Sequence, residues 1–299
     1  MTETQNAVHS LTPEVLATLQ GSTDERFKFL MTELVQHLHD YARKVDLKPE
    51  EWMAAIQFLT ATGQMCDDKR QEFILLSDTL GLSMLVVALA QARAGASSAK
   101  HAATPATEAT VQGPYYWEGA PDRDLGEDIA VGVPGEPAFY SGRVTDTEGR
   151  PIANALLDVW SGDGEGVYDM QMEGPAEMRV RGRFRTDAQG RYWFWSIRPS
   201  YYPIPMDGPV GTMIDSMGRD CNRPGHIHMI VSAEGHVPVT THLFVADSPY
   251  LETDVVFGVR DSLIVPFEQR EAGTADDGRN MPRPYWTAHY DFRLAPSVG

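Results

Sequence analysis

Apolar positions recur every three or four residues through the first third of the chain, a spacing typical of helices with one apolar face. Thr12, followed by Pro13, predicts the start of one helix, and Thr23-Asp24 predicts the start of a second. A third helix is expected from Pro49, and the apolar run 75–92 predicts a fourth, continuous and buried. The apolar stripe of the second helix consists of Phe27, Leu30, Met31, Leu34, Val35 and Leu38.

Beyond residue 105 the pattern becomes that of short β-strands separated by the turn sequences DTEG, DAQG and EG. The expected strands are 138–144, 153–160, 181–186, 191–197, 226–232 and 237–246. Neighbouring strands are expected to pair as a meander, and 191–197, apolar on both faces, is expected between two layers. The predicted fold is therefore α+β and mainly β: a helical region, 1–105, which includes the linker, and an antiparallel β-sandwich, 106–299.

Composition and charge narrow the class of protein. Acidic residues outnumber basic residues by 42 to 25, giving a formal net charge of -17, which disfavours binding to nucleic acid. The longest apolar stretch is far shorter than the ~20 residues of a transmembrane helix, so no membrane span is expected. Cys66 and Cys221 are too few for a disulfide framework, and the N-terminus has no secretory pattern, so a cytoplasmic location is expected.

The segment 223–228, with the sequence RPGHIH, is the strongest candidate for chemistry. His226 and His228 are two residues apart on an expected strand, so their side chains point to the same side, with Cα atoms about 6.6 Å apart. Two such imidazoles can bind one metal ion. Histidines at this spacing also occur in cores and on surfaces, where they only form hydrogen bonds, so both interpretations stay open.

Two tyrosines in expected turns could supply further ligands. Tyr168 lies in the sequence GEGVYD and Tyr202 in PSYYPIP; loop packing is the commoner role of such tyrosines. As metal ligands they need a strong Lewis acid, because a phenol with a pKa of about 10 stays protonated at neutral pH. Ferric iron meets this requirement, whereas zinc and magnesium suit phenolates poorly.

Taken together, the segments 166–168 (GVY), 199–202 (PSYY) and 223–228 (RPGHIH) resemble the intradiol ring-cleavage dioxygenases, the catechol 1,2-dioxygenase superfamily. The resemblance extends over most of the chain, with several motifs in the same order. The segments 75–78 and 202–211 are most similar to the members that cleave hydroxyquinol. The resemblance therefore implies a ring-cleaving enzyme that uses O2.

The resemblance implies one non-haem Fe(III) per chain, held by Tyr168, Tyr202, His226 and His228. It also implies that Tyr202 leaves the metal and takes a proton when a 1,2-diol binds, and that Arg223 stabilises negative charge on the ring; a structural salt bridge is the alternative role of Arg223. Hydroxyquinol (benzene-1,2,4-triol) would open between its vicinal hydroxylated carbons to 3-hydroxy-cis,cis-muconate, or maleylacetate. Catechol and chlorocatechol are the alternative substrates.

The resemblance also places residues in contact with the substrate. They are Leu75, Asp78, Val111, Gly113, Pro114, Tyr115, Ile204, Pro205, Arg223 and Val256. Asp78 could accept a hydrogen bond from the third hydroxyl of the triol, or could be an ordinary carboxylate on a helix surface. His242 stands where enzymes that cleave catechol carry a glutamine, and its role is open between packing and support of the metal site.

The family resemblance implies a homodimer formed by the N-terminal helices, with a phospholipid bound between them, although the apolar stripe could equally face a core. Two other interpretations compete with the dioxygenase. One is a cupin-like protein that binds Fe(II) through His226, His228 and Glu234, although Glu234 lies slightly too far along the chain for that motif. The other is a β-sandwich binding module in which the histidines and tyrosines only pack.

Overall fold

The computed structural model describes residues 3–98, 104–172 and 177–297 of the 299 residues. The chain divides into two compact units, residues 1–61 and 62–299. The predicted boundary near residue 105 therefore falls inside the second unit, because two helices group with the sheets that follow them. A domain boundary at 105 stays a prediction, and residues 99–103 of the predicted linker lie outside the described residues.

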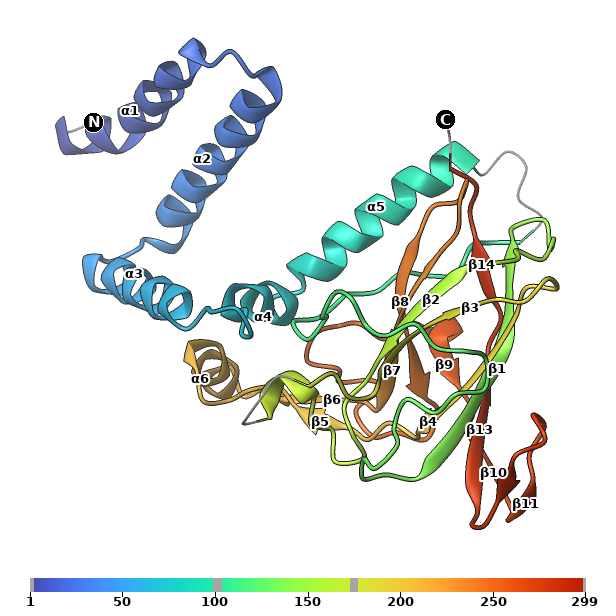
Figure 1. Ribbon diagram of the computed structural model, residues 1–299. Coiled ribbons are helices and arrows are strands. Elements are labelled where there is room, and N and C mark those ends of the chain that lie inside the picture. Colours follow the sequence, from blue (N-terminus) through green and yellow to red (C-terminus); the bar gives the residue numbers. More distant parts are fainter. Residues whose placement is uncertain (1–2, 99–103, 173–176, 298–299) are drawn as a thin grey trace. The chain divides into compact units, whose positions relative to one another are not determined.

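The first unit is helical (Figure 1, dark blue). It contains α1 (Glu3–Thr18), the short 3-10 helix η1 (Leu19–Gly21), α2 (Glu25–Val45) and most of α3 (Pro49–Gln64). The predicted start of α2 is confirmed, since the Asp24 side chain accepts a hydrogen bond from the Phe27 N–H at 2.9 Å. The predicted start at Thr12 is wrong. The Thr12 hydroxyl contacts His39 and accepts from Arg43, both at 2.8 Å, and α1 continues through Pro13.

The predicted fourth helix is two helices, α4 (Glu72–Thr79) and α5 (Leu82–Ser98). The break lies at Gly81, whose φ of +76° is left-handed and ends the first helix. Within the described part of the chain, no single helix has the length and apolarity to cross a membrane. Among the described helices, α4 taken together with the Leu82–Arg93 part of α5 has the length and apolar composition of a membrane span, but this pair is bent by 73°.

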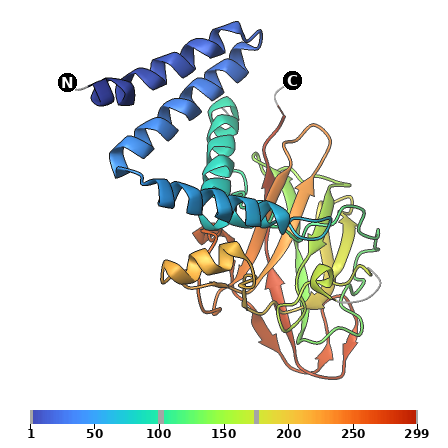
Figure 2. The ribbon, with the colours of Figure 1, turned by 90° about the vertical axis from the view of Figure 1, so that its left-hand side faces the viewer.

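Two five-stranded sheets form the rest of the second unit, coloured green to red in Figure 2. In the first sheet, β1 (Pro137–Asp146) pairs with β4 (Arg191–Ile197), β13 (Tyr285–His289) and β14 (Phe292–Leu294), and β10 (Glu268–Arg270) pairs with β13. The second sheet has the order β3 (Arg181–Arg185), β2 (Leu156–Trp160), β7 (His226–Ser232), β8 (Val239–Val245), β9 (Ile264–Val265).

Smaller elements complete this unit. They are the ladder of β5 (Tyr202–Pro203) with β6 (Asn222–Arg223), the ladder of β11 (Gly273–Thr274) with β12 (Asn280–Met281), helix α6 (Pro209–Ser216), and the 3-10 turns η2 (Asp169–Gln171) and η3 (Asp261–Leu263).

The predicted sandwich is confirmed, but its sheets are mixed rather than antiparallel. β1 runs parallel to β13 and β14, and β8 runs parallel to β9. The predicted meander holds for two pairs of consecutive predicted strands, β2 with β3 and β7 with β8, each antiparallel. β1 and β2 lie in different sheets, as do β3 and β4, because the turns between them carry the chain across the sandwich.

Aromatic side chains join the two sheets. Phe194 of β4 stacks on Tyr140 of the same sheet at 4.9 Å and on Phe184 of the other sheet at 4.8 Å between ring centroids. On the opposite face of β4, Trp195 packs against Phe139. The prediction that β4 is buried on both faces is therefore confirmed.

Candidate active site

The alternation of side chains along β7 separates core residues from candidate ligands. Ile227 and Met229 pack in the core between the sheets, so His226 and His228 point to the opposite face. His242 of β8 is the register partner of His228. Its ring lies 4.7 Å from that of His226 and 4.1 Å from that of His228, between centroids. The three histidines are buried and close enough together to hold a metal ion.

Two loops bring the predicted tyrosines to these histidines. The Tyr168 hydroxyl lies 2.9 Å from His228 Nε2 and 3.3 Å from the Tyr202 hydroxyl. His226 Nε2 lies 3.1 Å from His228 Nε2. The four residues predicted as ligands thus converge from three separate segments. Their side chains are closed off from solvent, Tyr202 being the most exposed at 7%.

Local contacts hold each tyrosine in place. Asp169, which follows Tyr168, forms a buried ion pair with Arg181 of β3, with 2.6 Å between Oδ2 and Nε. Tyr202 lies on β5, directly opposite Arg223 of β6. Gly166 allows the two loops to approach each other, since a Cβ there would lie 2.5 Å from Tyr202 Cβ.

Burial and nearby positive charge shift the pKa values of the four predicted ligands. Burial lowers the pKa of His228 well below its usual value, and the neighbouring imidazoles and Arg223 lower it further. Burial and then Arg223 lower the pKa of His226 in the same way. Burial raises the pKa of the Tyr168 phenol well above its usual value, and raises that of Tyr202 against the opposing effect of Arg223. Neutral imidazoles are ready metal ligands, whereas such phenols ionise only beside a strong Lewis acid. This donor set fits a trivalent ion such as ferric iron.

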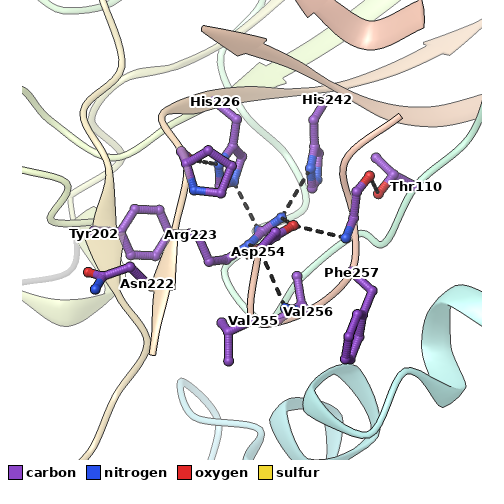
Figure 3. A network of polar contacts seen from close by, with 12 residues as sticks. Thr110, Tyr202, Asn222, Arg223, His226, His242, Asp254, Val255, Val256 and Phe257 are labelled. Atoms are coloured by element: carbon purple, nitrogen blue, oxygen red, sulfur yellow. Dashed lines mark hydrogen bonds and ion pairs between the residues drawn. The ribbon is translucent and has the colours of Figure 1, made fainter. Parts of the chain in front are cut away.

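Arg223 lies at the centre of a buried polar network (Figure 3). Its Nη1 is 3.0 Å from His226 Nε2 and its Nη2 is 3.5 Å from His242 Nδ1. On the other side it forms an ion pair with Asp254, with 3.1 Å between Nε and Oδ1. Arg223 therefore has both predicted features, a salt bridge and a position beside the histidines. Asp254 could not be predicted, because it is a single acidic residue in a loop without a recognisable spacing.

Apolar residues predicted to contact the substrate gather beside this network. Leu75 of α4, Val111, Ile204 and Val256 belong to one buried apolar cluster. Asp78, one helical turn after Leu75, is only 2% exposed, so it is not a surface carboxylate. Burial raises the pKa of Asp78, while hydrogen bonding to a nearby serine and the charge of Arg223 act in the opposite direction.

The remaining predicted contacts lie along the segment after the linker and beside Ile204. Tyr115 stacks on Tyr168 with 4.5 Å between ring centroids. Gly113, with a φ of +76°, lies against His228, because a Cβ there would be 3.4 Å from the imidazole Cε1. Pro114 and Pro205 are half-buried next to Gly113 and Ile204 in the chain.

Two observations bear on residues that the sequence left open or missed. Trp160 stacks on His228 with 4.6 Å between centroids, and only its place at the end of an expected strand hinted at this. Glu234 is exposed in the turn after β7 and is not in the group formed by the three histidines. The cupin-like interpretation is therefore wrong, since its carboxylate ligand is not at the site.

Comparison with known proteins agrees with this geometry. A family model described as dioxygenase matches residues 111–296, and one described as catechol dioxygenase N terminus matches residues 24–98. The chain belongs to the intradiol catechol dioxygenase family. The interpretation as a non-catalytic binding module is thereby wrong.

Several relatives of this dioxygenase are similar over nearly their whole length. A 6-chlorohydroxyquinol 1,2-dioxygenase of Cupriavidus pinatubonensis is 47% identical, with 97% of this chain and 98% of the relative covered. A hydroxyquinol 1,2-dioxygenase of Corynebacterium glutamicum is 46% identical, with 98% and 96% covered. The solved structure of a hydroxyquinol 1,2-dioxygenase from Pseudomonas putida DLL-E4 is 44% identical, with a TM-score of 0.85 and 98% and 100% covered.

The close approach at Gly166 gives a test of the site. Gly166→Ala should displace Tyr202 and lower the metal content of the purified dioxygenase, measured by plasma emission spectrometry. Gly149→Ala is the matched control. Both glycines have a φ of +83°, so both variants bear a backbone strain of about 1–2 kcal/mol, but nothing lies within 4 Å of a Cβ at Gly149. Equal metal content in the two variants would contradict the assignment of Tyr202.

Proposed function

We propose that this enzyme is a hydroxyquinol 1,2-dioxygenase that depends on Fe(III). It opens the ring of benzene-1,2,4-triol between the two vicinal hydroxylated carbons and places both atoms of O2 in the product, 3-hydroxy-cis,cis-muconate, or its tautomer maleylacetate. The observation that carries this proposal is the convergence of two phenol oxygens and two imidazole nitrogens beside a buried arginine and a buried aspartate. The activities of the relatives, which cleave hydroxyquinol or 6-chlorohydroxyquinol, support the same substrate class.

One iron per chain would be held by Tyr168, Tyr202, His226 and His228. When bound, ferric iron supplies the positive charge that favours ionised phenols and an ionised diol and makes the diol reactive toward O2. The chain excludes water from this place, because all four side chains are buried. It also supplies two neutral imidazoles that need not lose a proton before they bind.

Arg223 and Tyr202 have separate roles in this proposal. The Arg223 guanidinium keeps its charge, because the attraction of Asp254 and of the phenol oxygens outweighs the cost of burial and raises its pKa above the usual value. A fixed charge in a dry site stabilises negative charge as it develops on the substrate ring. Tyr202, more exposed than Tyr168, would be ionised by the bound metal and would accept a proton from a substrate hydroxyl at its phenolate oxygen.

Asp78 is the residue that we propose selects the triol. It places a carboxylate beside the cluster of Leu75, Val111, Ile204 and Val256, where the third hydroxyl of the substrate can donate to it. Catechol and chlorocatechol lack this hydroxyl and would leave a buried polar group without a partner, which a site of this kind penalises.

We also propose that the chain forms a homodimer through its first unit, with a phospholipid bound among the helices. Phe27, Leu30, Leu34 and Leu38 of α2 are each about half exposed, and such a row of large apolar side chains is typical of an interaction surface. Both cysteines are free thiols, which is compatible with the reducing cytoplasm that we propose as its location.

The iron assignment can be tested by the colour of the purified protein and by removal of one tyrosine hydroxyl group. The purified enzyme should contain one iron per chain and be red to purple, from charge transfer between phenolate and Fe(III). Tyr202→Phe should change this absorption and slow turnover by about 10²- to 10⁴-fold. Tyr201→Phe, which removes the hydroxyl of the exposed neighbour, should do neither. A colourless protein loaded with iron, or unchanged turnover in Tyr202→Phe, would contradict the assignment.

Substrate choice can be tested by initial oxygen uptake with benzene-1,2,4-triol and with catechol at equal concentration. The triol should be preferred. Asp78→Ala should lower that preference about 10- to 100-fold, since a hydrogen bond to a charged group contributes about 1.5–3 kcal/mol. Asp68→Ala, which removes an exposed carboxylate with the same charge, should leave the preference unchanged. Faster cleavage of catechol by the wild type would overturn the choice of substrate.

The proposed dimer can be tested by sedimentation equilibrium. The wild type should have twice the mass of one chain, and its organic extract should contain phospholipid by mass spectrometry. Leu34→Asp with Leu38→Asp should give monomers that carry no lipid. Val131→Asp, at a position in the second unit that is 78% exposed, should remain dimeric. A monomeric wild type would refute the dimer, and a dimer free of lipid would refute the lipid.

A further inference from the structure

The carboxylate of Asp254 is bound from two sides, although it is only 5% exposed. On one side its Oδ1 accepts from Arg223 Nε at 3.1 Å and its Oδ2 accepts from Nη2 at 3.4 Å. On the other side it accepts backbone N–H groups of its own loop, that of Gly258 at 2.8 Å and that of Val256 at 3.4 Å. Figure 3 shows the carboxylate between the guanidinium and this loop. One side chain therefore joins the proposed catalytic arginine to a segment of the pocket wall.

The orientation of Arg223 depends on this contact. Among the described residues, Asp254 is the carboxylate with which Arg223 forms an ion pair. The backbone of Arg223 belongs to a ladder of two residues. Besides Asp254, its buried side chain contacts the rings of His226 and His242. Holding such a side chain in one conformation costs side-chain entropy, which the paired hydrogen bonds to the carboxylate offset. The guanidinium is thereby held with Nη1 3.0 Å from His226.

The loop on the other side of Asp254 carries a predicted substrate contact. Val256 is 2% exposed and packs in the apolar cluster with Leu75 and Ile204. Phe257, in the left-handed region with a φ of +59°, donates its N–H to the Asp254 carbonyl at 2.9 Å, so the loop winds tightly around the carboxylate. The Gly258 carbonyl accepts from the Thr110 hydroxyl at 2.9 Å.

We propose that Asp254 is a positioning residue with two separate effects. It holds the Arg223 guanidinium beside the histidines, which sets the rate of ring cleavage. It also holds Val256 in the pocket wall, which sets the fit of the substrate ring. This inference rests on the proposed function and adds a residue that neither the family resemblance nor the comparisons assign.

Asp254→Asn tests the first effect. Turnover number should fall about 100-fold, the loss expected from misplacing a catalytic group by about 1 Å. Iron content and the phenolate absorption should stay at the wild-type level, because the contacts of Asp254 run to Arg223 and to its own loop rather than to a predicted ligand. Loss of iron together with activity would overturn the proposal, since Asp254 would then support the metal site as a whole.

A double-mutant cycle separates the two effects. If Asp254 acts on the rate through Arg223, Asp254→Asn should not slow turnover further in an Arg223→Gln background, which also restores neutrality to the buried pair. Asp254→Asn should also lower the preference for the triol over catechol. This loss should persist in the Arg223→Gln background, because it is transmitted through Val256. Equal rate losses in the two backgrounds would overturn the proposal. The cycle compares turnover ratios between variants, measured with whichever diol the wild type cleaves. The proposed function is tested separately, by the preference of the wild type between the triol and catechol.

Asp146→Asn is the matched control for loss of a buried carboxylate. Asp146 is 6% exposed and accepts from Arg150 Nε at 2.6 Å and from two loop N–H groups, those of Glu148 and Arg150, at 2.9 Å. The carboxylate has the same kinds of partner as Asp254, although Arg150 is exposed where Arg223 is buried, and it lies at the end of β1, outside the site. The control should lower the free energy of unfolding without changing turnover or substrate preference. A control that reproduced the kinetic effects of Asp254→Asn would assign those effects to general destabilisation and overturn the proposal.

Discussion

The structure depends on holding the four side chains that we propose as metal ligands together in a buried place. Contacts of 2.9–3.3 Å join the donor atoms of four buried side chains in series, those of Tyr202, Tyr168, His228 and His226. Two neutral imidazoles and two phenols can be buried at little electrostatic cost, whereas four charged ligands could not. The same burial keeps the phenols protonated until a strong Lewis acid is present.

The fold supplies this arrangement from one face of one sheet. The core face of β7 packs against the other sheet, and its outer face carries the histidines beneath loops that bring the tyrosines. Arg181 of β3 holds the loop of Tyr168 through Asp169, and the ladder of β5 with β6 sets Tyr202 opposite Arg223. The rigid strands thus fix the histidines, while ion pairs and short ladders fix the residues that must come from loops.

Features that arise from local periodicity could be predicted from the sequence, whereas features that depend on distant partners could not. The spacing of His226 and His228 and the N-cap at Asp24 are local, and the structure agrees with both. The pairing of β1 with β4 rather than β2 depends on residues far along the chain, so a local turn sequence could not predict it. Only the family resemblance could place Tyr168 and Tyr202 beside the histidines. Asp254 could not be predicted, because its role depends on its contact with Arg223, 31 residues away in the chain.

Charge balance connects the metal site with the pocket. With the proposed trivalent ion bound, Arg223 pairs with Asp254, and two phenolates would offset two of the three charges of the ion. The carboxylate of Asp78, whose pKa burial raises, would complete neutrality when it ionises. Neutrality matters because uncompensated charge at this depth is costly. A doubly deprotonated diol would add two negative charges, and such a site can hold them only if another group loses negative charge. In the proposed mechanism Tyr202, the more exposed of the two tyrosines and the register partner of Arg223, would do so by taking a proton.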